Sequence, residues 1–116
     1  MKTKSFTTIL VALGLLTSCA QMNPHPMDMT SAVRNAKTSG DHNALAKHYE
    51  DVARDMDAKV QEHKKLLYEY ETHPYYGKRA QDLKAHCEVL IRSYKRAAEA
   101  NMSMAKIHHQ MAEETK

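Results

Sequence analysis

Helix-breaking residues are rare in this chain, and their positions constrain its fold more than any other feature. After residue 29 only Gly40, Pro74 and Gly77 strongly disfavour an α-helix. The segments between them are rich in Ala, Lys, Glu, Gln, Met and Leu, and they show neither the alternation typical of strands nor an internal repeat. The sequence therefore predicts an all-α fold.

The first long helix is expected over residues 42–71. Its apolar side chains form one stripe, which Lys59 and His63 interrupt. The helix should end just before Pro74, because a proline disfavours the α conformation in the residue that precedes it. The stripe consists of Leu45, Tyr49, Val52, Met56, Val60, Leu66, Leu67 and Tyr70.

The second long helix should begin near Lys78, after a short turn at residues 75–77. Its apolar residues recur in steps of three and four, which is typical of a helix packed along one seam. The seam is predicted to contain Ala80, Leu83, Cys87, Leu90, Tyr94, Ala97, Asn101, Met104, His108 and Met111.

A short helix is expected before these two, over residues 31–39. Thr30 is its predicted N-cap and Gly40 its C-terminal stop. Asp41 is then the predicted cap of the first long helix.

Two long helices joined by a short turn make an antiparallel helical hairpin, here spanning residues 30–116. A hairpin alone leaves one side uncovered. Small residues such as Ala53, Ala98 and Ala105 would let helices approach closely, which favours a homodimer that forms a four-helix bundle. Docking of the short N-terminal helix is the alternative way to cover the hairpin.

The first nineteen residues have the three-part layout of a secretory signal. Lys2 and Lys4 precede an apolar stretch from residue 6 to residue 16, and the stretch is followed by Thr17, Ser18 and Cys19. The segment Leu-Thr-Ser-Cys at 16–19 resembles the lipobox of bacterial lipoproteins. The resemblance implies that residues 1–18 are a signal peptide and that Cys19 becomes the lipidated first residue, with palmitate among the acyl chains.

The residues after Cys19 indicate where the anchored protein would lie. Ala20 stands where an Asp would favour the inner membrane, so the resemblance implies an outer-membrane lipoprotein that faces the periplasm. Residues 19–29 contain Pro24 and Pro26 and read as a flexible tether. Without Lys2 and Lys4 the chain has 15 basic and 14 acidic side chains, from 17 and 14, and this near-neutral balance gives no indication of nucleic-acid binding.

Histidine and methionine are abundant after the signal segment, which holds none of the eight histidines and one of the eight methionines. Both are ligands for copper, and histidine also binds zinc. A hairpin that pivots near residue 75 brings together residues whose numbers sum to about 150. This rule predicts two candidate metal sets. One consists of His63, His86 and Cys87, and the other of His42, Met104 and His108.

Other interpretations of these residues remain open. Polar residues in a helical seam commonly fix register, and methionines commonly fill gaps in a core. Cys87 lies in the predicted seam and has no second thiol nearby, which favours a structural role. Tyr75 and Tyr76, at the tip of the hairpin, are candidates for contact with a partner. No catalytic constellation occurs, so no enzymatic activity is predicted.

The body of the chain, with runs such as GDHNALAKHYEDVA and YYGKRAQDLKAHCEVLIRSY, resembles a group of uncharacterised bacterial helical-hairpin proteins. The resemblance implies a shape and no activity. We therefore expect a lipid-anchored structural or interaction protein of the cell envelope, which binds a second copy or another envelope protein. The alternatives are a copper- or zinc-binding lipoprotein and a peptidoglycan tether joined through Lys116.

Overall fold

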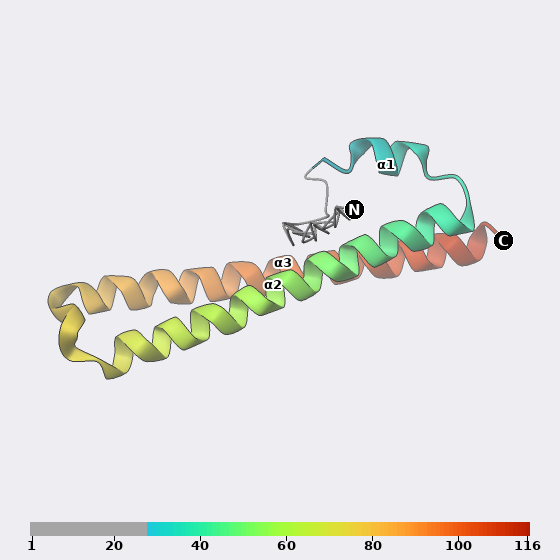
Figure 1. Cartoon of the computed structure of the whole chain (residues 1–116). Coiled ribbons are helices and arrows are strands. Elements are labelled where there is room, and N and C mark those ends of the chain that lie inside the picture. The colour runs from blue at the N-terminus through green and yellow to red at the C-terminus, as the bar shows by residue number, and fades with distance from the viewer. Residues whose placement is uncertain (1–27) are drawn as a thin grey trace, which may run out of the picture.

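Two long antiparallel helices, α2 (Ser39–Thr72) and α3 (Ala80–Glu114), make up most of the fold (Figure 1). The computed structural model describes residues 28–116. A short helix α1 (Thr30–Asn35) precedes the pair, and a 3-10 turn η1 (Pro74–Arg79) joins its two members. The predicted all-α hairpin with a short N-terminal helix is confirmed. Residues 1–27, which include Cys19 and most of the predicted tether, lie outside the described residues.

A reciprocal pair of hydrogen bonds fixes the start of α2. The Asp41 amide donates to Thr38 Oγ1 (3.1 Å), and Asp41 Oδ2 accepts from the Thr38 amide (2.9 Å). This capping box places the helix start at Ser39, so the prediction that Gly40 ends the preceding helix is wrong. Asp41 is the third residue of α2 and not its N-cap, because the Thr38 side chain already holds the free amide.

Helix α1 is shorter than predicted and begins one residue earlier. Thr30 is its first residue and Met29 its N-cap, because the Asp28 carboxylate accepts a hydrogen bond from the Thr30 amide (2.9 Å). The helix ends at Asn35, where Ala36 turns extended. None of its residues is buried, so α1 adds nothing to the core of the hairpin.

The reversal between the long helices occurs where the helix breakers predict it. His73 is extended (φ −111°, ψ 120°), as expected for a residue before proline. Gly77 has φ +52° and ψ −133°, a conformation that side-chain-bearing residues rarely adopt. Tyr76 packs edge-on against Tyr70 of α2, with ring centroids 4.9 Å apart. Gly77 therefore redirects the chain, and the tyrosine pair holds the turn against the end of α2.

The seam between the helices is built mainly of small residues. α3 buries Cys87, Ala98, Ala105, His108 and Ala112. Facing them, α2 buries His42, Leu45, Ala46, Ala53 and Val60. Alanines at this frequency let the helix backbones approach closely, and little room is left between them for longer side chains.

The predicted seam of α3 is partly wrong for this reason. Leu90, Met104 and Met111 were assigned to it, but they are 36%, 42% and 37% exposed. Ala98, Ala105 and Ala112, each one residue after a predicted seam position, are buried in their place. The apolar stripe of α3 is wider than one seam, and the smallest residues on it face α2.

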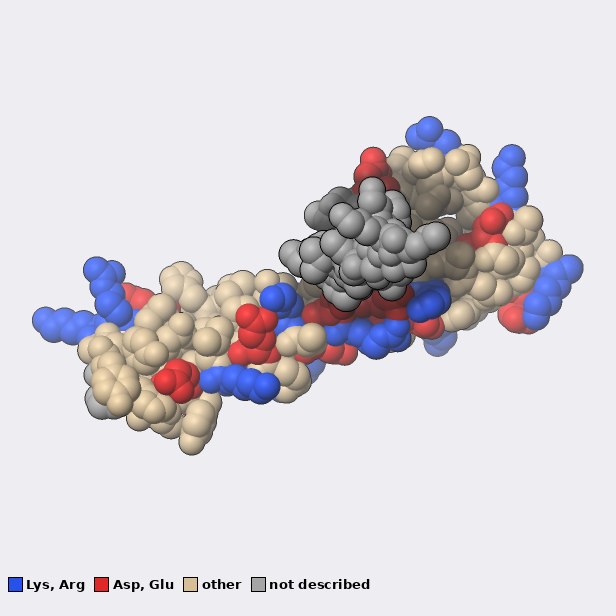
Figure 2. Space-filling model, viewed as in Figure 1, with Lys and Arg blue, Asp and Glu red and all other residues tan. Residues whose placement is uncertain are grey.

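Charged side chains of both signs alternate over the face of the hairpin seen in Figure 2. Several form pairs within α2, such as Lys59 with Glu62 (2.8 Å). These exposed pairs each contribute little to stability. The visible surface thus carries no broad field of one sign, as the near-neutral composition predicts.

Candidate functional site

The most distinctive side-chain cluster lies at the open end of the hairpin, opposite the turn. The Nδ1 atoms of His42 and His108 are 3.2 Å apart, and the two rings are stacked with centroids 5.5 Å apart. Each residue is only 7% exposed. The predicted meeting of these two histidines across the hairpin is confirmed, while metal binding there stays a prediction.

The local sequence explains why the imidazoles meet inside the seam. His42 lies in the first turn of α2, directly after the capping box, and His108 lies in the last two turns of α3. The buried alanines Ala46, Ala105 and Ala112 keep the helix axes close beside them. Tyr49 also stacks on His108, with ring centroids 5.5 Å apart. The pair is therefore held by aromatic packing as well as by its hydrogen bond.

Burial disfavours the charged form of His108. Removal from water lowers the pKa of His108, and the neighbouring His42 lowers it further. One proton between the two Nδ1 atoms makes a hydrogen bond, whereas two protons place a pair of donors face to face. Burial therefore favours the neutral form of the His108 ring.

This arrangement predicts that the hairpin loses stability in acid. Because the folded pKa of His108 lies below the unfolded value near 6.5, the unfolded chain binds more protons as the pH falls through that value. With a chelator present, thermal unfolding should shift to lower temperature between about pH 7 and pH 5. The slope of unfolding temperature against pH should flatten in His108→Gln. It should persist in His86→Gln, because the His86 side chain is exposed. Equal slopes in both variants would contradict the assignment.

The second predicted set, His63, His86 and Cys87, is not brought together. His86 is exposed, because adjacent residues of a helix point about 100° apart and Cys87 occupies the seam. His63 stacks on Tyr94 of α3, with centroids 5.5 Å apart, and its buried Nδ1 has no hydrogen-bond partner within the described residues. Burial also raises the pKa of the Cys87 thiol, which lowers its reactivity.

Larger metal-binding groups are not seen in the part of the chain that the structure describes. Between residues 28 and 116, no three His, Cys, Asp or Glu side chains gather closely enough to hold an ion. Met104, assigned to the set of His42 and His108, is one helical turn before His108 and 42% exposed. It lies on the outer side of α3, where solvent reaches it.

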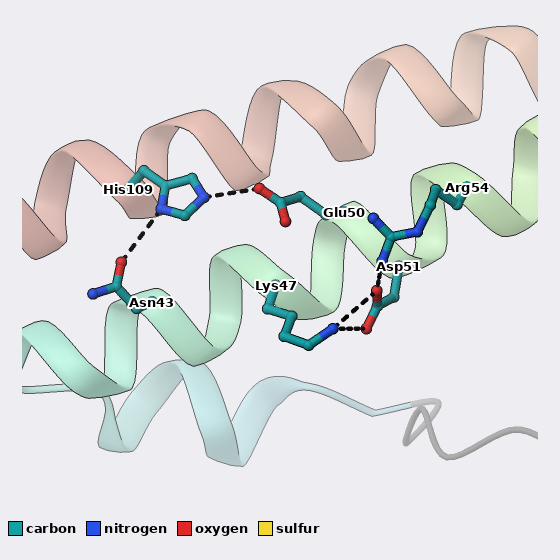
Figure 3. Close-up of polar contacts among 6 residues, drawn as sticks. All are labelled: Asn43, Lys47, Glu50, Asp51, Arg54 and His109. Carbon is teal, nitrogen blue, oxygen red and sulfur yellow. Dashed lines mark hydrogen bonds and ion pairs between the residues drawn. The ribbon is translucent and has the colours of Figure 1, made fainter.

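A second cross-helix contact at the open end was not predicted (Figure 3). His109 Nε2 lies 2.8 Å from Glu50 Oε1, and its Nδ1 lies 3.3 Å from Asn43 Oδ1. Beside it, Asp51 pairs with Lys47 (3.1 Å) and with Arg54 on α2. The facing rule that pairs residues 42 and 108 gives residue 41 as the partner of 109, so it does not predict the contact with Glu50, which lies nine residues further along α2. The contacts of His109 join α2 and α3 at the open end of the hairpin, on the exposed side of the buried seam.

A groove of about 680 Å³ runs along α3 beside this contact. Met102 and Ala105 supply apolar lining, and Glu50, Lys106 and His109 supply polar groups. The groove therefore presents a mixed apolar and polar surface beside Glu50 of α2.

The two tyrosines predicted at the tip of the hairpin differ in exposure. Tyr75 is 82% exposed and stacks on His73, with centroids 5.6 Å apart. Tyr76 is half-buried through its contact with Tyr70. Tyr75 is thus available to a partner, whereas Tyr76 stabilises the turn.

Comparisons of the chain with protein-family models, with curated proteins and with solved structures find no match. Within residues 28–116, no helix combines the length and the apolar character needed to span a bilayer.

Proposed function

We propose that this chain is a structural or interaction protein of the cell envelope, anchored by lipid on Cys19, whose hairpin associates with a second copy of itself. The proposal rests on where side chains of different size lie: small ones in the seam between the helices, and large apolar ones on the outside of α3. Five of the ten buried side chains are alanines, and Leu45 and Val60 are the only large apolar side chains buried among the described residues. Large apolar side chains instead lie on the outside of α3.

These exposed side chains share one face of α3. Leu90, Met104 and Met111 are separated by multiples of seven residues, and Ile107 lies between the two methionines. Residues at such spacing line one side of a helix. Ile107 is 54% exposed, and the small residues Ala97 and Ala100 occupy the intervening positions of the stripe. We name Leu90, Ala97, Ala100, Met104, Ile107 and Met111 the outer face of α3.

A second hairpin is the occupant that suits the outer face of α3. Two hairpins packed through it form a four-helix bundle, and a twofold dimer uses the same surface on both copies. The charge of the body is close to balanced, so repulsion between copies is small. A contiguous apolar surface of this kind is uncommon on monomeric proteins.

The position of the C-terminus bears on the alternative role as a peptidoglycan tether. Lys116 follows α3 at the open end of the hairpin, near the start of α2, and pairs with Glu113 (2.7 Å) (Figure 1). The chain therefore returns to the end of the hairpin at which α2 begins. A covalent link from Lys116 to a distant wall would require the hairpin to open, so this arrangement supports the interaction role over wall tethering.

Association is tested by placing charges on the outer face. The double variant Met104→Glu with Met111→Glu should weaken dimerisation at least about 100-fold, because each dimer would bury four unpaired carboxylates. The matched control, Ser103→Glu with Gln110→Glu, adds the same charges one residue away and should leave the dimer intact. Light scattering of the full chain in non-ionic detergent measures the mass, and circular dichroism checks helix content. A monomeric wild type, or equal masses for both variants, would contradict self-association.

Lipid anchoring is tested separately by fractionation of cells that produce the full chain. Cys19→Ser should move the protein from the membrane to the soluble fraction or leave its precursor unprocessed, because stable attachment depends on the acyl chains. Cys87→Ser is the control and should remain with the membrane. Processing and membrane retention of Cys19→Ser equal to those of the wild type would disprove the anchor.

A further inference from the structure

We propose that His42 and His108 form a two-histidine site for a tetrahedral d10 cation, Zn(II) or Cu(I), at the open end of the hairpin. This binding function goes beyond association, because it concerns the seam within one hairpin and not its outer face. It rests on the placement of two buried imidazoles with their Nδ1 atoms directed at each other.

The distance between the two nitrogens matches the geometry of a tetrahedral ion. Zn–N bonds of about 2.0–2.1 Å at the tetrahedral angle place two ligand nitrogens about 3.3–3.4 Å apart. The Nδ1 atoms of His42 and His108 are 3.2 Å apart. A shift of a few tenths of an ångström would therefore admit the ion without separating the helices.

The protons of the pair allow both nitrogens to bind. In the metal-free pair, one Nδ1 carries a proton and donates it to the lone pair of the other. When a cation binds, that proton relocates through solvent to Nε2 of the same ring, and both Nδ1 lone pairs bind the metal. No proton is released overall from the neutral pair.

The protein supplies two of the four positions around such an ion from the seam. Water can occupy the others at the end of the hairpin, where His42 lies in the first turn of α2. Met104 lies on the outer face of α3 and is 42% exposed, so both cations are expected to be held without its thioether.

The binding test uses the full chain in non-ionic detergent. Zn(II) is titrated against competing chelators, and Cu(I) is titrated in the same way under anaerobic conditions. We expect one ion per chain. His42→Phe and His108→Phe, which keep a ring in the seam, should each weaken binding at least tenfold. The matched control His86→Phe replaces an exposed histidine of α3 and should bind like the wild type. Met104→Leu should leave the affinity for both cations unchanged.

A measurement on the wild-type protein tests the two-histidine site without relying on the folding of the variants. In spectra of 15N-labelled histidine, the Nδ1 signals of His42 and His108 should move to metal-bound positions, with Nε2 protonated in both rings. Movement of other histidines in their place would overturn the proposal, as would unchanged affinity in both Phe variants or no stoichiometric binding. Light scattering of the same samples reports association independently, so the two proposals can fail separately.

Discussion

Replacement of Ala105 by leucine is expected to destabilise the hairpin by about 1–3 kcal/mol, because three added carbon atoms would have to fit between two closely packed helices. Ala105 is 1% exposed and lies in the seam between His108 and Ala98. The larger side chain would also push α3 away from α2 beside the histidine pair. Urea denaturation followed by circular dichroism measures the loss.

The control for this variant is Ala85→Leu, the same substitution at an exposed position of α3. It should change the free energy of unfolding by less than about 0.5 kcal/mol, since it neither fills nor empties the seam. Similar effects of the two variants would contradict the close packing of the seam, because they would show that the helices can separate at Ala105 without a loss of stability.

Gly77→Ala is expected to destabilise the protein by about 1–3 kcal/mol through backbone conformation alone. Gly77 has φ +52° and ψ −133°, a region essentially confined to glycine. A Cβ atom built there meets nothing within 4 Å, so no steric clash with other residues contributes. The variant should unfold at lower temperature while its helix content stays close to that of the wild type.

Gly40→Ala provides the opposite outcome from the same substitution. Gly40 lies in the first turn of α2, where an added Cβ would make only an ordinary contact with Thr38 Oγ1 at 3.7 Å. Alanine suits a helix better than glycine, so this variant should be up to about 1 kcal/mol more stable. Destabilisation of both variants by the same amount would contradict the special conformation of Gly77.

Much of the fold follows from the sequence because the helix breakers are few and well separated. Pro74 and Gly77 mark the reversal, and the long segments on either side have strong helical propensity. A reversal at a known place fixes which residues face each other, and this is why the meeting of His42 and His108 could be predicted from two residue numbers.

The finer features depend on choices that periodicity does not resolve. The apolar stripe of α3 is wide enough for two seams, and packing distance selected Ala98, Ala105 and Ala112 over the larger neighbouring residues. The start of α2 depends on the hydrogen bonds between Thr38 and Asp41, which compete with other caps nearby. His86 fell outside the seam because one helical step of about 100° separates it from Cys87.

The single reversal at η1 also sets an order for folding. Tyr70 and Tyr76 meet across six residues of chain, whereas His42 and His108 are 66 residues apart. Loop-closure entropy favours the short connection first, so the helices should join from the turn outward, and the histidine pair should form last. Contacts that form after the transition state mainly slow unfolding. A bond across the open end would therefore prolong the lifetime of the closed hairpin while leaving its rate of formation nearly unchanged.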